Sequence, residues 1–454
     1  MRYRQERRKK LRWGRILGTT LMVLVLLCAG GICLRLLMPE QELPSTDSTV
    51  PPAVSDVVQD APEAPDAPST KDDPVIRTLL NDVQTRRSCY SENGYYYLSP
   101  ELMMQGACNL KYVDFATQQE IFLCDAPNCT HNTASCSSYI PDMYECVNVL
   151  VHEKHLFLVY WGWSGNPVSI EIRDLTGANA RTLVTLNSGE KFGLSGLAAD
   201  SENFYFIRQR VENQNGSILY TNTLESVAFD SGTLRTICSL DKEDFFVGTA
   251  HSTFIIRTLQ RDDQNNVLVT HKAVDKQGNA MEGVFLPEPY DSMSKTTYFM
   301  DDGTWYEFEY AGSCTINKHD IFTGETRMIT DSFPASSTST WVGCPTSDGL
   351  LPVSVKNFSS EENDRYVLDL ASGTWKRHEL NYMAINGREN NVAVEGEYNN
   401  YYLIKMGETK TTSATYSDKI GLETTDRAIP VFALIQKDDF YNSNANYLPV
   451  TRVN

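Results

Sequence analysis

The chain has 454 residues with a formal net charge of −18, and 41% of its residues are hydrophobic. Residues 1–38 hold nine Lys and Arg residues against a single acid, Glu6, so they carry 9 − 1 = +8 and the rest of the chain carries −26. A body this acidic does not attract a phosphate backbone, which argues against a nucleic-acid partner.

A basic N-terminal stretch precedes the apolar run Ile16–Leu34. These nineteen residues would form about 28 Å of helix, close to the thickness of a bilayer's hydrocarbon core. We therefore predict a cytoplasmic tail at residues 1–15 and one transmembrane helix at residues 16–38 in the cell membrane, with the rest of the chain extracytoplasmic. The alternative is a cleaved signal peptide, but Ile32–Leu34 continue the apolar run where a small-residue cleavage site would be needed.

Residues 39–74 are rich in Pro, Ala, Ser and Asp and contain no aromatic residue. Nine acids against Lys71 give this stretch a charge of −8. It cannot bury enough apolar surface to fold, and its charges repel one another, so we predict a disordered linker. The folded extracytoplasmic body would then span residues 75–454.

This body lacks long helical patterns and contains many short runs in which apolar and polar residues alternate. Alternation with a period of two over four to eight residues, bounded by Gly, Asn and Asp, indicates β-strands. The clearest runs are Tyr95–Leu98, Leu156–Trp161, Asn203–Arg208, Thr253–Thr258, Tyr366–Leu370 and Tyr401–Lys405.

An internal repeat specifies the all-β architecture. A strand that ends in Asp, a short turn rich in Thr, Ser and Gly, and a second strand recur along the body. The repeated residues are Asp114, Asp174, Asp230, Asp275, Asp320 and Asp369. Their spacing of 45 to 60 residues is typical of a β-propeller with four strands per blade. We expect these Asp side chains to cap turns rather than to catalyse a reaction.

We predict seven blades, with six or eight as alternatives. Six blades carry the Asp hairpin, and a degenerate seventh would span about residues 382–425, with Tyr401–Met406 as one of its strands. The late apolar strand Ile429–Ile435 would then return to complete the first blade beside Tyr95–Leu98, which leaves no open sheet edge.

The most distinctive local motif is LCDAPNCTHNTASC, residues 123–136. It places Cys124, Cys129, His131 and Cys136 in a C-x4-C-x-H-x4-C spacing, and three thiolates with one imidazole form the ligand set of a closed structural zinc site. Disulfides are the main competing interpretation, because an extracytoplasmic location permits them, and thiols without a ligand are a third. Three further cysteines lie nearby in the sequence and could also form disulfides with those of the loop: Cys89, Cys108 and Cys146.

The chain also resembles an uncharacterised group of membrane-anchored or lipid-anchored β-propeller proteins of gut Firmicutes. The residues that carry the resemblance are SENGYYYLSP at 91–100, the Cys/His loop, and FALIQKDDFYNSNANY at 432–447. The resemblance implies a propeller of the TolB-like or low-density-lipoprotein-receptor-like type in the bacterial envelope, and it implies no activity.

No catalytic residues can be assigned, because the sequence has no HExxH, GxSxG, P-loop or GxGxxG motif. We therefore expect a non-catalytic binding or interaction module whose propeller loops hold an envelope protein or another ligand. One alternative is a carbohydrate-binding or carbohydrate-active envelope protein, and a second is the ligand-sensing subunit of a membrane signalling complex. Aromatic residues gathered around one funnel would favour the carbohydrate alternative; the candidates are Trp161, Trp163, Trp305, Tyr306, Trp341 and Trp375.

Overall fold

The computed structural model describes most of the predicted body. The described residues are 74–80, 87–101, 107–141, 147–162, 167–193, 196–214, 217–262, 264–311, 313–334, 340–342, 345–356, 363–417 and 421–453. They all belong to one unit, residues 66–454. The predicted cytoplasmic tail, the transmembrane helix and the linker up to residue 73 lie outside this part of the chain, and none of the helices within it has the length and apolar character needed to cross a membrane.

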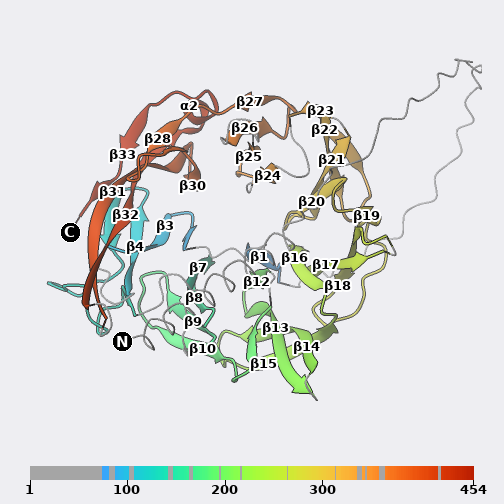
Figure 1. Cartoon of the computed structure of the whole chain (residues 1–454), viewed down its shortest axis with the longest axis horizontal. Coiled ribbons are helices and arrows are strands. Elements are labelled where there is room, and N and C mark those ends of the chain that lie inside the picture. The colour runs from blue at the N-terminus through green and yellow to red at the C-terminus, as the bar shows by residue number, and fades with distance from the viewer. Residues whose placement is uncertain are drawn as a thin grey trace, which may run out of the picture. The chain divides into compact units, whose positions relative to one another are not determined.

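Seven four-stranded antiparallel sheets follow one another around a ring in the described part of the chain (Figure 1). In each sheet the four strands lie in chain order from the inner to the outer edge of the ring. This is a seven-bladed β-propeller, as the repeat predicts.

In the first four blades the second and third strands have six or seven residues in blades one and two and 8 to 12 residues in blades three and four. Blade one comprises β2 (Ser88–Tyr90), β3 (Gly94–Ser99), β4 (Cys108–Asp114) and β5 (Gln119–Phe122). Blade two comprises β7 (Val147–His152), β8 (His155–Tyr160), β9 (Ser169–Asp174) and β10 (Arg181–Thr185). Blade three comprises β12 (Leu197–Ala199), β13 (Asn203–Gln214), β14 (Ser217–Ala228) and β15 (Leu234–Leu240). Blade four comprises β16 (Asp244–Ala250), β17 (Thr253–Arg261), β18 (Val267–Val274) and β19 (Tyr290–Asp291).

The last three blades complete the ring. Blade five comprises β20 (Lys295–Phe299), β21 (Thr304–Ala311), β22 (Ser313–Asp320) and β23 (Thr326–Phe333). Blade six comprises β24 (Thr340–Val342), β25 (Leu350–Lys356), β26 (Asn363–Asp369) and β27 (Trp375–Arg377). Blade seven comprises β30 (Val394–Tyr398), β31 (Tyr401–Ser417), β32 (Gly421–Gln436) and β33 (Tyr447–Pro449).

The remaining elements join these blades or extend them. A separate hairpin and one short helix flank blade seven: β28 (Asn381–Met383), β29 (Glu389–Asn391) and α2 (Lys437–Tyr441). Four strands extend blades one and three: β1 (Arg77–Leu80), β6 (Tyr139–Ile140), β11 (Glu190–Phe192) and β34 (Thr451–Arg452). The strands β1 and β34 pair with the edge strands β12 and β5, whereas β6 and β11 pair with β4 and β13.

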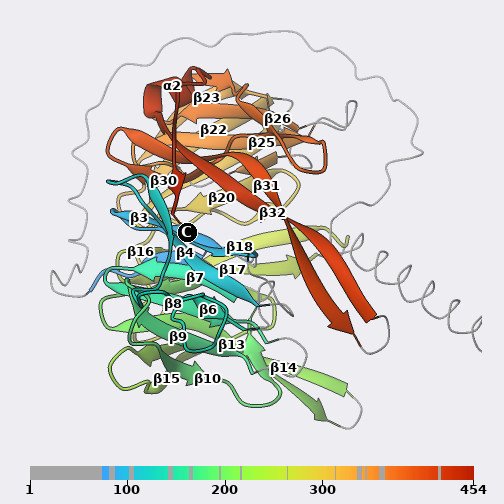
Figure 2. The ribbon, with the colours of Figure 1, turned by 90° about the vertical axis from the view of Figure 1, so that its left-hand side faces the viewer.

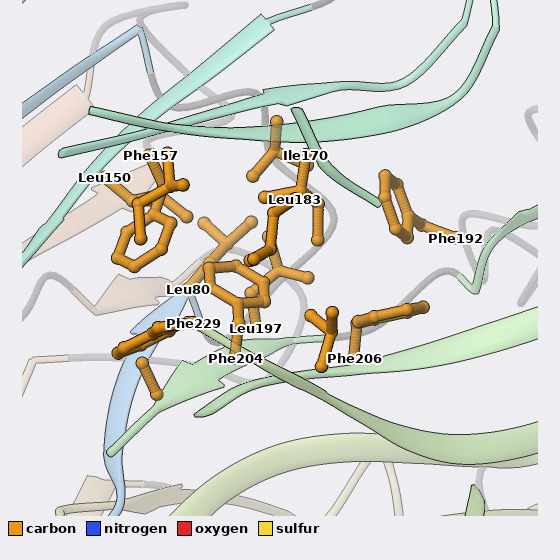
Figure 3. Close-up of a cluster of buried hydrophobic side chains, with 14 of the residues drawn as sticks. Leu80, Leu150, Phe157, Ile170, Leu183, Phe192, Leu197, Phe204, Phe206 and Phe229 are labelled. Carbon is orange, nitrogen blue, oxygen red and sulfur yellow. The ribbon is translucent and has the colours of Figure 1, made fainter. Parts of the chain in front are cut away.

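The hydrophobic core lies between the blades, because each sheet packs against a neighbour on both of its faces. Along β13, Phe204 and Phe206 point into the cluster shared with blade two, whereas Tyr205 and Ile207 point into the cluster shared with blade four. Figure 3 shows the first of these clusters, where the rings of Phe157 and Phe204 lie 4.9 Å apart. Side chains that alternate along a strand therefore serve two cores at once.

Four of the six repeated Asp residues cap turns that follow the third strand by accepting backbone N–H groups: Asp114, Asp275, Asp320 and Asp369. Asp174 accepts the side-chain amide of Asn179 instead. Asp320 Oδ1 accepts the backbone N–H groups of Phe322 and Thr323, both at 2.8 Å, and Asp369 Oδ1 accepts that of Ala371 at 2.8 Å. Burial opposes ionisation of Asp320, but these N–H groups outweigh it and lower the pKa of its carboxyl group. The predicted structural role is confirmed at these positions.

The ring closes in a different way from the prediction. Ile429–Ile435 belongs to β32, the third strand of blade seven, which pairs with β31 and not with blade one. It also packs against blade one, because Phe432 and Leu434 share a cluster with Tyr95 and Tyr97. The sequence prediction was wrong here because a strand buried on both faces has the same pattern in either blade. The seventh blade accordingly extends from β30 to β33, beyond the predicted 382–425.

The strand that closes blade one is β34, which pairs in parallel with β5 at the outer edge. Arg452 Nε lies 2.8 Å from Glu120 Oε1, and Lys111 Nζ lies 2.9 Å from the same oxygen. The side chains of Lys111 and Glu120 are 0% and 3% exposed. A buried ion network therefore fastens the C-terminal segment to the first blade.

The first described residues pack at the inner edge of blade three, where β1 pairs with β12. Lys276 Nζ donates to the Pro74 carbonyl at 2.6 Å, and Ile76 donates its N–H to the His251 carbonyl at 2.8 Å. Thr78 donates its N–H to Asp301 Oδ1 at 3.0 Å. The segment that follows the predicted linker is thus held by blades three, four and five.

Candidate functional site

The two sides of the propeller differ in the connections that they carry. The second and third strands of each blade connect on one side, which we call the hairpin face. The third and fourth strands connect at the opposite side, which we call the Asp-turn face, because antiparallel strands reverse direction at each connection. The Cys/His loop follows β5 and returns through β6, which pairs with Cys108 and Asn109 at the hairpin-face end of β4.

Both ends of the Cys/His loop are held by blade one. Leu123 is buried in the core between blades one and two, and the Ser137 hydroxyl donates to its carbonyl at 2.9 Å. Leu110 in β4 donates its N–H to the Ser138 carbonyl at 2.7 Å. The loop therefore starts and ends on a fixed strand, which sets the positions of its cysteines.

The structure brings all four predicted ligands together. One ligand atom from each of Cys124, Cys129, His131 and Cys136 lies within 4.8 Å of the other three. His131 Nδ1 lies 3.3 Å from Cys136 Sγ. Sulfur ligands of a tetrahedral zinc ion, bound at about 2.3 Å, are about 3.8 Å apart. The four side chains thus have the spacing of a zinc-ligand set.

Local backbone geometry points the ligands inward. Asn128 and His131 have φ values of 58° and 55°, in the left-handed region that Asn and His adopt more readily than most residues. The turn at His131 lets its backbone N–H approach Cys129 Sγ at 3.4 Å. A donor directed at the sulfur stabilises the thiolate that a metal requires.

Neighbouring side chains orient the imidazole. The His131 ring stacks on Phe122, with ring centroids 4.2 Å apart and an interplanar angle of 12°. Lys111 Nζ lies 4.4 Å from the centroid of the Phe122 ring, and Asn109 Nδ2 donates to the His131 carbonyl at 2.7 Å. These contacts fix the orientation of the His131 ring from outside the Cys/His cluster, as neighbouring groups do around a structural metal.

The pKa shifts of His131 and Cys124 favour the metal-binding forms of these two side chains, whereas that of Cys136 opposes it. Burial and then the Lys111 charge lower the pKa of His131, so the imidazole is neutral and can act as a ligand at neutral pH. Burial alone would raise the pKa of Cys124, but a hydrogen bond from the Ala126 backbone and others from the loop side chains outweigh it and lower the pKa. Burial raises the pKa of Cys136.

Six cysteines in the described part of the chain are free thiols: Cys108, Cys124, Cys129, Cys136, Cys238 and Cys314. Cys108 and Cys314 are buried in blade cores, and burial raises the pKa of each to about 12. Cys146 and Cys344 lie outside the described residues.

The aromatic residues named from the sequence do not gather around one funnel where their side chains are described. Trp161 packs on the core between blades two and three, Trp305 lies in the core between blades four and five, and Trp375 packs on the core between blades five and six. Trp163 and the side chain of Trp341 lie outside the described part.

Two long hairpins were not predicted from the sequence. The strands β13 and β14 have 12 residues each, and β31 and β32 have 17 and 16, whereas β8 and β9 have six each. At about 3.3 Å per residue these hairpins extend roughly 20 to 35 Å beyond a six-residue strand. Figure 2 shows both projecting on the same side of the blades. For the β31–β32 hairpin, the uninterrupted polar and β-branched run at 407–417 is the feature of the sequence from which the extra length could have been predicted.

The base of the first hairpin is held by ion pairs. Arg208 Nη2 lies 2.8 Å from Glu225 Oε1, and Arg210 Nη2 lies 2.8 Å from Glu190 Oε1. Glu225 is fully buried, and Glu190 comes from β11, which adds a strand beside β13. Leu219 and Tyr220, farther along the hairpin, are 47% and 43% exposed. A fixed base thus presents apolar side chains to solvent.

No protein-family model and no curated protein matches the sequence. Solved structures similar to the chain are β-propellers of the oligogalacturonate lyase and TolB types. An oligogalacturonate lyase in complex with manganese is 13% identical, with 78% of this chain and 91% of that chain covered and a TM-score of 0.43. Puromycin hydrolase is 12% identical, with 83% and 53% covered and a TM-score of 0.45. TolB from Acinetobacter baumannii is 10% identical, with 78% and 77% covered and a TM-score of 0.32. These likenesses concern the fold alone.

Proposed function

We propose that the protein is a non-catalytic binding module, tethered to the cell membrane by one N-terminal helix, that holds an extracytoplasmic protein partner on its hairpin face. The observation that carries the proposal is the projection of the β13–β14 and β31–β32 hairpins from the same face (Figure 2). Binding residues concentrate on loops that a rigid scaffold positions, and here two hairpins extend that scaffold into solvent.

The attachment of the first described residues supports a partner surface on the hairpin face. Pro74, Ile76 and Thr78 bond to Lys276, His251 and Asp301, all of which lie in turns of the Asp-turn face. A linker that ends at Pro74 would therefore reach the propeller on the side opposite the hairpins. The attachment point of the linker would thus leave the hairpin face open to a partner.

Site-specific photo-crosslinking in cells tests the proposal. Tyr220 and Thr409, both exposed on the long hairpins, are replaced one at a time by benzoylphenylalanine in the full-length protein. The matched control is the exposed Gln277 on the Asp-turn face. We expect one protein partner crosslinked from both hairpin positions and not from Gln277. Crosslinks from Gln277 alone, or none from either hairpin, would contradict the proposal.

We further propose that Cys124, Cys129, His131 and Cys136 hold one structural zinc ion. The donor set supports this, since three thiolates and a neutral imidazole are preferred zinc ligands and four protein ligands leave no position for a reacting water. The ion would order a loop with little apolar mass of its own and keep it against blade one.

A further inference from the structure

A cavity of about 330 Å³ lies between blades four and five, at the Asp-turn face and away from both the Cys/His loop and the long hairpins. Its outer wall is the segment between β18 and β19, which contributes Phe285, Pro287 and Pro289. The volume is at the lower end of the range for small-molecule sites, roughly 300 to 1,000 Å³.

The apolar wall is held in place by the blade that it faces. Phe285 donates its N–H to the Ile321 carbonyl at 2.7 Å, and its own carbonyl accepts the indole N–H of Trp305 at 3.1 Å. The two prolines restrict the backbone that follows. The cavity is therefore formed before any ligand arrives, which lowers the cost of binding.

The opposite wall is polar and comes from blade five. Lys295 Nζ lies 3.1 Å from Glu307 Oε2, and their side chains are 28% and 12% exposed. The His319 ring stacks on Trp305 with centroids 3.8 Å apart, and its Nδ1 lies 2.9 Å from the Thr326 hydroxyl. An ammonium, a carboxylate and a hydroxyl thus line the wall that faces Phe285 and the two prolines.

His319 leaves one polar atom unsatisfied. Its Nε2 is buried and has no hydrogen-bond partner among the residues that the structure describes. Burial lowers the pKa of the ring, so it is neutral at neutral pH. A buried polar atom without a partner is unusual in a folded protein. Because this atom is closed off from solvent, the polar contacts that the cavity offers a ligand come from Lys295, Glu307 and Thr326.

We infer that this cavity binds a neutral sugar, one or two pyranose rings in size. A pyranose has an apolar C–H face, which matches Phe285 and the prolines, and hydroxyl groups at its edge, which match Lys295 and Glu307. The lining carboxylates of Glu288, Glu307 and Asp320 outnumber the one ammonium, so an anionic sugar is disfavoured. This site does not rest on the proposed partner surface, because it lies at the other face.

Saturation-transfer NMR on the full-length protein, in a detergent without a sugar headgroup, tests the inference. The probes are glucose, galactose, mannose and N-acetylglucosamine, with glucuronate as the anionic comparison. We expect at least one neutral sugar to bind with a Kd of about 1 mM or tighter. Glucuronate should bind at least about tenfold more weakly.

Two variants locate the binding. Glu307→Gln and Lys295→Met each remove one polar partner, and each should weaken sugar binding about tenfold or more. The control is Lys272→Met, which breaks a comparable Lys–carboxylate pair, 2.6 Å to Asp244, outside the cavity. It should leave binding unchanged. The inference is overturned if no neutral sugar binds, if glucuronate binds as tightly, or if both cavity variants bind like the unaltered protein.

Discussion

The side chains of the Cys/His loop are each positioned by a different contact. Cys129 accepts the His131 backbone N–H, and Cys136 Sγ lies 3.2 Å from the Ser138 hydroxyl. His131 is oriented by stacking on Phe122. If these residues hold zinc as we propose, replacing one of them would leave the other three without a closed coordination sphere.

Replacement of Cys129 by Ser should abolish zinc binding. We expect about one zinc per chain in the full-length protein by elemental analysis and close to none in Cys129→Ser, because a neutral hydroxyl is a poor ligand for zinc. The control, Cys238→Ser, changes a half-buried cysteine in blade three and should keep the metal. Equal zinc content in Cys129→Ser and the unaltered protein would contradict the assignment, as would no zinc in either.

At the scale of the element, strand length separates blade structure from projecting surface. The pairing of β31 with β32 continues from the Tyr401–Gln436 pair to the Ser417–Gly421 pair. Only the part near Tyr402 and Ile404 packs in a blade core. Lys405 Nζ lies 2.6 Å from Glu408 Oε1 at the base of the hairpin. The last buried side chain toward the tip is Ile429, which pairs with Thr409. Beyond that pair none of the side chains that the structure describes is buried, so we expect this part to be dispensable for the blade and available for a partner.

Removal of the projecting part should separate binding from folding. In this variant Lys410 and Ala428, which pair directly just beyond the buried Ile429, are joined through an Asn-Gly turn suited to a two-residue hairpin. We expect the melting temperature to change by less than about 4 °C and partner crosslinking from Tyr220 to fall about tenfold.

A second loop replacement controls for the engineering itself. An Asn-Gly turn between Arg261 and Val267 shortens the β17–β18 hairpin on the same face, where the strands are of ordinary length. This change should leave crosslinking unaltered. Crosslinking that survives loss of the long β31–β32 hairpin would place the partner elsewhere.

At the scale of the whole molecule, closure of the ring depends on a short C-terminal segment. Thr451 donates its N–H to the Gln118 carbonyl at 2.8 Å, and Val453 donates to the Glu120 carbonyl at 2.9 Å. Arg452 also donates to the Pro430 carbonyl at 3.2 Å, which joins blade seven to blade one. Residues 332 positions apart in sequence thus share one ion pair, Arg452 with Glu120.

Loss of the Arg452 charge, which helps to close the ring, should destabilise the whole propeller. Arg452→Ala leaves the buried Glu120 with only Lys111, so we expect the free energy of unfolding to fall by about 3 kcal/mol. Urea denaturation followed by tryptophan fluorescence measures it. The control is Arg377→Ala, which removes an exposed pair with Asp364 and should cost less than about 1 kcal/mol. Equal losses in the two variants would show that Arg452 has no special part in closure.

The sequence by itself determined the all-β class, the seven blades and the four side chains of the Cys/His loop. It could do so because strand alternation, the Asp-capped turns and the ligand spacing are local properties of the chain. Tertiary structure decided the rest. Whether Ile429–Ile435 pairs in blade seven or blade one depends on contacts far apart in sequence, since its two-faced burial pattern suits either position. The inner-edge place of β1 and the convergence of Phe285 with Lys295 and Glu307 also arise only when the blades pack together.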